Sequence, residues 1–178
     1  ITRVNKANFD FDGDGKSDVS IFRPSTSDWW YLSSLTGNQT PVNWGNAADK
    51  LAPADFDGDN KTDVAVFRPS NGTWYIFNSA TSTATISQFG ANGDLPIPND
   101  FDGDGRADIG VFRPSDGGWY QLRSLGNQVF IQQFGSNGDI PQIFDYDGDG
   151  FGDLAVFRPS DGTWHFFKSS DSSYTAFP

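Results

Sequence analysis

Four short aspartate-rich segments are the residues of this sequence best suited to chemistry. Each reads Asp-aromatic-Asp-Gly-Asp-Gly/Asn-x-x-Asp, and successive copies begin 45 residues apart. Carboxylates at loop positions 1, 3, 5 and 9, on a chain bent by glycine, offer an oxygen cage for a hard cation. Calcium takes about six to eight oxygen ligands at about 2.3–2.6 Å. The pattern therefore predicts about four bound Ca²⁺ ions. The predicted ligands are Asp10, Asp12, Asp14, Asp18, Asp55, Asp57, Asp59, Asp63, Asp100, Asp102, Asp104, Asp108, Asp145, Asp147, Asp149 and Asp153.

Two other interpretations of these loops compete with the calcium cage. An EF-hand needs a bidentate Glu at position 12, but this chain places an aliphatic residue of an alternating strand there, such as Ile21 or Val66. Alternatively, the aspartates only make Asx-turns with their own backbone, which would gather sixteen carboxylates without a counter-charge. Asn60 replaces glycine at position 6 of the second loop. Because Asn tolerates left-handed backbone geometry, that loop is also expected to bind.

The charge of the chain is concentrated in these same loops. The net charge is −11, all 23 acidic residues are Asp, and 16 of them lie in the four loops. The acidity is therefore mainly a property of the metal sites. The 12 Lys and Arg are scattered without a basic stripe, which argues against nucleic acid as a partner. No apolar run approaches the ~20 residues needed to cross a membrane, so no membrane insertion is expected.

The elements that must position the loops are strands. An excess of Asp over Glu, with 20 Gly and 10 Pro, favours turns and strands over helices. Each repeat contains four strand-like pieces, and the loop separates the first piece from the second. The expected first strands are Thr2–Phe9, Leu51–Ala54, Pro96–Asn99 and Pro141–Phe144. The expected second strands are Val19–Phe22, Val64–Phe67, Ile109–Phe112 and Leu154–Phe157.

The second strands alternate large aliphatic residues with small ones, as in Val64-Ala65-Val66. A period of two puts these on opposite faces, so one face is expected to fill a core and the other to allow a neighbouring sheet close by. The third strand opens with a tryptophan that we assign to the core, and the next aromatic is expected to be partly exposed. His165 occupies that second aromatic position, so we interpret it as a replacement at a tyrosine position of the repeat and not as a catalytic base. The core tryptophans are Trp29, Trp74, Trp119 and Trp164.

Four antiparallel strands per 45 residues is the unit size of a propeller blade. We therefore predict an all-β fold: a β-propeller of four four-stranded antiparallel blades, with a calcium loop between the first and second strands of each. Residues 1–178 would form a single repeat domain, with repeats at about 1–45, 46–90, 91–135 and 136–178. Four whole blades favour a closed ring. Dimerisation, or end-to-end joining through the terminal strands, Thr2–Phe9 and Ser172–Phe177, stays open.

Arginines recur in Phe-Arg-Pro-Ser turns, and aspartates recur in the loops that connect one repeat to the next. If successive strands alternate in direction, both sets lie on the face opposite the metal. Arginine–aspartate pairs across adjacent blades would then latch the blades together. Alternatively, these residues line shallow sugar pockets with charged hydrogen bonds. We favour the latch, because all four repeats keep the arginine. The residues concerned are Arg23, Arg68, Arg113, Arg158, Asp49, Asp94 and Asp139.

The loop, the short apolar strand after it and a Phe-Gly pair before Gly-Asp-x-Pro together resemble the FG-GAP/VCBS repeat. This repeat builds the blades of integrin α-chain propellers and of many secreted bacterial proteins. The resemblance covers essentially the whole chain and implies a β-propeller with calcium in the hairpin between the first and second strands of each blade. It implies no specific activity.

We expect an extracellular, calcium-stabilised module for structure, adhesion or assembly, secreted or at the cell surface, whose partner is a protein or glycan surface. Extracellular placement follows because weak calcium loops would stay empty in a resting cytosol. The start at Ile1, without Met or a signal peptide, favours a processed or excised segment. The alternative is a lectin-like, carbohydrate-binding module. No enzymatic activity is expected, since Glu and Cys are absent and the single His lacks a partner in the repeat pattern.

Overall fold

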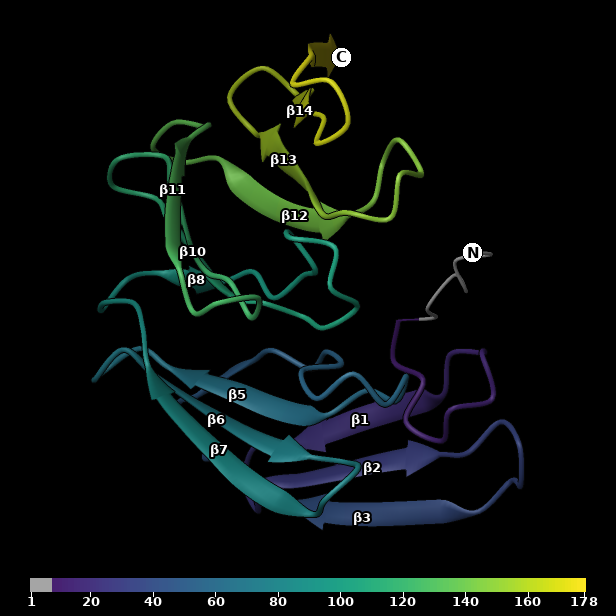
Figure 1. Ribbon diagram of the computed structural model, residues 1–178. Helices are drawn as coiled ribbons and strands as arrows, with labels where there is room; N and C mark the ends of the chain where they lie inside the picture. Colours follow the sequence, from purple (N-terminus) through teal and green to yellow (C-terminus); the bar gives the residue numbers. More distant parts are fainter. Residues whose placement is uncertain (1–7) are drawn as a thin grey trace. The chain divides into compact units, whose positions relative to one another are not determined.

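The computed structural model describes residues 8–178. The chain divides into two compact units, Ile1–Gln88 and Phe89–Pro178. All regular structure in residues 8–178 is β-strand (Figure 1), and within this range no helix could span a membrane. Antiparallel sheets follow one another along the chain, one per repeat. The predicted fold class, an all-β chain of four β-propeller blades, is confirmed.

The first unit contains two sheets. The first sheet has three strands within the described residues, in the order β1-β2-β3, and the second has four, in the order β4-β5-β6-β7. Their bounds are β1 Val19–Arg23, β2 Asp28–Leu32, β3 Gln39–Asn43, β4 Lys50–Leu51, β5 Val64–Arg68, β6 Thr73–Asn78 and β7 Thr83–Gln88.

The second unit contains two four-stranded sheets, in the orders β11-β10-β9-β8 and β12-β13-β14-β15. Every pairing joins strands that are consecutive in the sequence and antiparallel. Each sheet is therefore a simple meander. The bounds are β8 Leu95–Pro96, β9 Ile109–Arg113, β10 Gly118–Leu122, β11 Val129–Gln133, β12 Ile140–Phe144, β13 Asp153–Arg158, β14 Thr163–Phe167 and β15 Tyr174–Phe177.

The second strands lie where they were predicted, but two of the first strands are shorter. Strands β4 and β8 have two residues each, and beyond them only single bridges form near the loop. Pro53 and Pro98 interrupt these segments, because proline has no N–H to donate to the ladder. The fourth repeat has Ile143 at this position, and its β12 runs for five residues. Of the predicted strand Thr2–Phe9, residues 2–7 lie outside the described residues, and Phe9 belongs to a turn.

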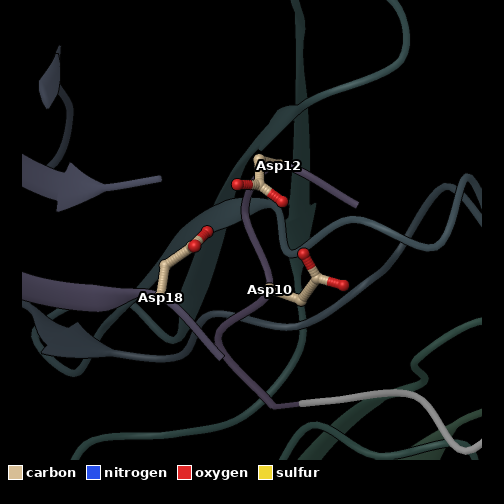
Figure 2. Close-up of side chains that lie close together, drawn as sticks. All are labelled: Asp10, Asp12 and Asp18. Carbon is tan, nitrogen blue, oxygen red and sulfur yellow. The ribbon is translucent and has the colours of Figure 1, made fainter. Parts of the chain in front are cut away.

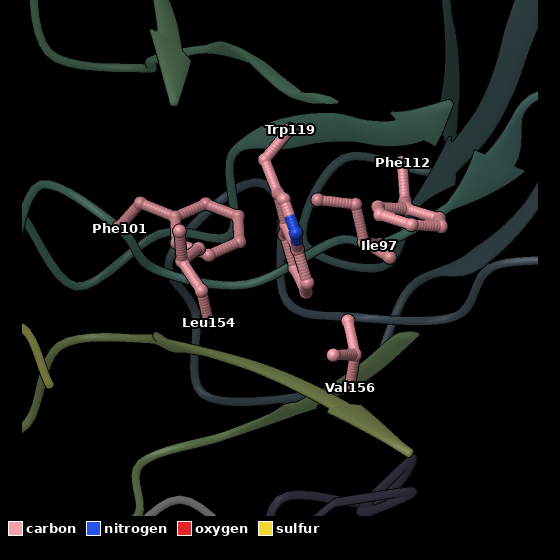
Figure 3. Close-up of a cluster of buried hydrophobic side chains, with 6 residues drawn as sticks. All are labelled: Ile97, Phe101, Phe112, Trp119, Leu154 and Val156. Carbon is pink, nitrogen blue, oxygen red and sulfur yellow. The ribbon is translucent and has the colours of Figure 1, made fainter. Parts of the chain in front are cut away.

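Large side chains from two neighbouring sheets form the core of the second unit (Figure 3). Trp119 and Phe112 from one sheet contact Leu154 and Val156 from the next. The first unit repeats the arrangement, with an aromatic cluster on the first sheet facing two valines of β5. Three of the four predicted core tryptophans are buried, and Trp164 is half-buried.

The first sheet departs from the predicted core pattern. Val19 and Ile21 of β1 are 71% and 55% exposed, whereas their counterparts Val64 and Val66 are 4% and 0% exposed. The valines of β5 are buried because they pack on the cluster around Trp29 in the preceding repeat. Residues 8–88 of the first unit provide no such cover for β1. Within the first unit, the expectation that this face fills a core is therefore not met for the first sheet.

Gly110 of β9 provides a test of the packing. A Cβ at this position would lie 2.8 Å from the carbonyl oxygen of Ile97. We expect Gly110→Ala to lower the free energy of unfolding by about 1–3 kcal/mol, as overpacking typically does. Ser20→Ala at the same position of the first sheet is the control and should change it little. Urea denaturation gives both values, and equal stabilities for the two variants would contradict this packing.

Candidate metal centres

Each aspartate-rich loop brings three carboxylates together. Figure 2 shows the triad of Asp10, Asp12 and Asp18 in the first loop. In each triad, one oxygen from each residue lies within 4.8 Å of the other two. The loops of the later sheets lie between the first and second strands, β4–β5, β8–β9 and β12–β13, as predicted. The other triads are Asp55, Asp57 and Asp63; Asp100, Asp102 and Asp108; and Asp145, Asp147 and Asp153.

The triads fit a hard cation of calcium's size. Two oxygens bound to one Ca²⁺ at about 2.3–2.6 Å can be at most about 5 Å apart, and the observed limit of 4.8 Å satisfies this. Burial raises the pKa of Asp63 to about 6, and the charge of Asp57 acts in the same direction. Burial likewise raises the pKa of Asp108 to about 6. A cation would offset the charges that these sites hold at neutral pH.

Backbone turns hold the carboxylate at position 1. The two carboxylate oxygens of Asp10 accept hydrogen bonds from the N–H groups of Gly13 and Gly15, at 2.6 and 2.8 Å. Both glycines have positive φ. Asn60, with φ 68°, stands at the position of Gly15 in the second loop and donates its N–H to Asp55 in the same way. The predicted left-handed Asn60 is confirmed. These Asx-type contacts do not exclude a metal, because a carboxylate has about four lone-pair sites.

The aspartate at position 9 ties the loop to a second hairpin. Asp63 is fully buried. One of its oxygens accepts the N–H of Phe56 at 2.8 Å, and the other accepts the N–H of Ser79 at 2.6 Å. Ser79 lies just after β6, at the turn into β7. One carboxylate therefore joins the start of the loop to the far turn of the same sheet, and the other three loops repeat this arrangement.

The aspartates at position 5 lie outside the triads. Each accepts a hydrogen bond from a serine hydroxyl in the β2–β3 turn or its counterpart, at 2.8–2.9 Å. The structure thus separates the four predicted ligands of each loop into a cluster of three and one neighbour held by serine. These serines are not among the predicted site residues, although they recur every 45 residues in the sequence. The pairs are Ser34–Asp14, Ser79–Asp59, Ser124–Asp104 and Ser169–Asp149.

Within each unit, the two loops contact each other directly. The N–H of Thr62 in the second loop donates to the carbonyl of Asp10 in the first, at 2.6 Å. Gly152 and Asp100 make the same bond in the second unit, also at 2.6 Å. Each donor residue directly precedes a triad aspartate, and each acceptor carbonyl is that of a triad aspartate. The backbone therefore fixes the spacing of the two triads in each unit.

Three of the recurrent arginines form bidentate ion pairs. Arg68 donates from Nε and Nη2 to the two oxygens of Asp49 at 2.8 and 2.9 Å, and the Asp49 side chain is fully buried. The same pair recurs twice in the second unit. The guanidinium of Arg158 lowers the pKa of Asp139 by hydrogen bonding to it. The pairs are Arg68–Asp49, Arg113–Asp94 and Arg158–Asp139.

Each ion pair lies inside one repeat, so the predicted latch between adjacent blades is wrong in this respect. Antiparallel pairing places Lys50 opposite Phe67, which brings the loop before β4 to the end of β5 in the same sheet. The pair therefore fastens the connecting loop to the blade that follows it. For Arg23 the corresponding earlier residue is Val4 rather than aspartate, and it lies outside the described residues.

The FG-GAP-like repeat family matches residues 10–66 and 100–156, more than half of the chain. The chain therefore belongs to the FG-GAP-like repeat family. Each matched segment runs from an aspartate-rich loop to the second strand of the following blade. No curated protein matches the chain in sequence.

Two solved lyases share the fold. A streptogramin B lyase is 10% identical with a TM-score of 0.59, over 90% of this chain and 51% of the lyase. A catalytically inactive virginiamycin B lyase from Staphylococcus aureus, solved with quinupristin, is 12% identical with a TM-score of 0.60, over 99% of this chain and 57% of the lyase. The chain thus spans little more than half the length of these lyases. At such low identity, the likeness is one of fold alone.

These two structures correct one expectation. The absence of Glu and Cys, together with a single His, led us to expect no enzymatic activity. Both structural relatives are lyases, so a fold of this kind is compatible with catalysis. The exclusion of an enzyme from residue composition is therefore wrong.

The ion pairs give a direct test. Arg113→Ala would leave the buried carboxylate of Asp94 without its bidentate partner. Losing hydrogen bonds to a charged group typically costs about 1.5–3 kcal/mol, and we expect a loss of that size in thermal or urea unfolding. Arg106→Ala removes an exposed arginine of the same unit as a control. If the two variants unfold alike, the ion pair does not stabilise the blade.

Proposed function

We propose that this chain is an extracellular, calcium-stabilised module for assembly or adhesion. The FG-GAP-like repeat fold supports a structural or assembly role. Calcium binding is supported by the recurrence of one carboxylate triad in every repeat, each with oxygens within 4.8 Å of one another. Sixteen loop aspartates in a chain of net charge −11 would repel one another unless cations are bound.

Calcium bound to a triad would stabilise a whole blade rather than a single loop. The aspartate at position 9 belongs to the triad and also accepts the N–H of the distant turn, as Asp63 does from Ser79. A cation held there would therefore fix the loop and the β6–β7 hairpin together. Extracellular placement fits this role, because calcium is abundant there and scarce in a resting cytosol.

The face of β1 that is uncovered within the first unit supports assembly. Val19 and Ile21 are exposed, while their counterparts Val64 and Val66 pack on the aromatic cluster of a preceding blade. The chain itself thus shows what covers a face of this kind. We take the occupant to be the corresponding aromatic face of a blade in a second copy of the chain. A protein or glycan surface as a further partner stays a prediction.

A carbohydrate-binding role is the second candidate, but the turn arginines do not support it. Arg68, Arg113 and Arg158 are each held by a buried aspartate. Such pairs fasten loops and leave few donors for a sugar.

Calcium removal is the first test of the proposal. A ligand that binds only the native state adds about 2.7 kcal/mol per site at a hundredfold excess over Kd. We therefore expect calcium to raise Tm and chelator to lower it. Asp102→Ala should lower Tm in calcium more than Asp171→Ala, whose side chain lies outside the triads. A Tm that ignores both calcium and chelator would contradict the calcium role.

Ile21→Lys tests the assembly face. A charge in an apolar interface is costly to desolvate, so the variant should have a smaller mass in solution than the parent, by light scattering at equal concentration. Ile86→Lys is a matched control, because Ile86 is also exposed, at 64%, on another strand. A parent chain that is monomeric in solution would contradict the proposal that a second copy covers β1. If Ile21→Lys also lowers its Tm, the face is covered within the chain, as a closed ring predicts.

A further inference from the structure

A groove lies in the second unit between its two sheets. Residues of β10 and β11 line one wall, and residues around the loop Asp145–Asp153 and the end of β14 line the other. The side chains that matter here are Gln121, Arg123, Phe130, Phe151, Lys168 and Ser172. None of them belongs to a carboxylate triad.

A sequence difference between the two units accounts for this groove. Two repeats earlier, the position of Gln121 is occupied by Tyr31, whose ring stacks on Phe11 with centroids 4.7 Å apart. Tyr31 also packs against the hydrophobic cluster of the first unit. In the second unit Phe101 replaces Phe11 and is equally buried, at 6% exposed, but Gln121 provides no ring to stack on it. A space filled by an aromatic in one unit is therefore polar in the other.

Gln121 and Arg123 form an organised polar pair in this groove. Gln121 is only 2% exposed, and its amide oxygen accepts hydrogen bonds from Nε and Nη2 of Arg123, both at 3.2 Å. The guanidinium also lies over the ring of Phe130, 4.1 Å from its centroid. Arginine has five N–H donors, and these two bonds use two of them. The guanidinium is thus held in place with donors left for a ligand.

The other side chains of the groove define the ligand class. Lys168 adds a second cation from the opposite wall, where the carboxylate of Asp149, which accepts the hydroxyl of Ser169, is also part of the lining. Phe130, 41% exposed, offers C–H groups the ring face that Arg123 does not cover, and the ring of Phe151 lines the same groove. Ser172 and Gln132 offer hydroxyl and amide groups. Cations for a carboxylate, aromatic faces and hydroxyl-binding groups together match an acidic sugar.

The geometry points to a binding site for an acidic saccharide, such as a chain of uronic acids, in this groove. The carboxylate of one sugar would face Arg123 and Lys168, and a sugar ring would lie on Phe130 or Phe151. The two cations of the groove, Arg123 and Lys168, lie outside the metal loops, although the loop Asp145–Asp153 forms part of one wall. The inference places carbohydrate recognition in the second unit only, because the first unit carries Tyr31, Ser33 and Thr40 in place of Gln121, Arg123 and Phe130.

The probe is a trisaccharide of galacturonic acid, titrated calorimetrically into the intact chain in calcium-containing buffer. A neutral galactose trisaccharide is its control. We expect the acidic sugar to bind about tenfold or more tightly than the neutral one, because charge-assisted hydrogen bonds are roughly twice as strong as neutral ones. Added salt should weaken the acidic sugar's binding. Equal binding of the two sugars, or none at millimolar concentration, would overturn the inference.

Gln121→Tyr installs the residue that the first unit uses. We expect its ring to stack on Phe101, to leave Tm close to the parent's and to abolish saccharide binding. Arg123→Gln should remove the preference for the acidic sugar. If Gln121→Tyr does not fold, saccharide binding by Arg123→Gln tests the site instead. Arg106→Gln removes the same charge at an exposed position outside the groove and should bind like the parent.

Two further outcomes would count against the site. If Gln121→Tyr or Arg123→Gln binds the acidic trisaccharide as tightly as the parent does, the sugar binds elsewhere. An acidic peptide that binds the parent more tightly than the trisaccharide, and loses affinity in Arg123→Gln, would make this a peptide site. Failure of calcium to raise Tm is a separate result and would affect only the calcium proposal.

Discussion

The buried aspartate at position 9 of each loop is the interaction on which the blades depend. Asp63 and Asp108 are both fully buried, yet each accepts backbone N–H groups from the loop start and from the opposite turn. A buried carboxylate is costly unless its charge is satisfied by hydrogen bonds or a cation. The loop, the second strand and the far hairpin must therefore fold together around it. The same residue belongs to the carboxylate triad, so fold and candidate metal site share one constraint.

The remaining contacts extend that constraint along the chain. Thr62 and Gly152 bind the carbonyl of a triad residue in the preceding loop, which joins the two blades of each unit at their loops. At the other end of the sheets, bidentate pairs such as Arg68–Asp49 fasten each connecting loop to the blade that follows. Between these ends, aromatic side chains of one sheet meet aliphatic side chains of the next. Hydrogen bonds at one end of the sheets and ion pairs at the other thus hold the apolar core between them.

Much of the fold follows from the sequence because its pattern is repeated. A 45-residue period and strict alternation in the second strands are enough to place the loops, these strands and the class of fold. The short first strands were harder to predict, because Pro53 and Pro98 act on hydrogen bonding rather than on the hydrophobic pattern. The partner of each arginine depended on strand pairing: register brings Asp49 to Arg68 within one sheet. The Gln121 groove arises where one repeat differs from the others in sequence, whereas β1 is exposed because the first unit holds no described blade before it. A single averaged repeat shows neither feature.

Counting bound calcium tests the central claim most directly. Four equivalent triads, each built on a buried aspartate at position 9, predict that equilibrium dialysis against calcium finds about four ions per chain. Replacing Asp108 with asparagine keeps the side chain's shape while removing one charge, and should lower this number by about one. A chain that binds no calcium while fully folded, or that binds the same number after this substitution, would contradict the account.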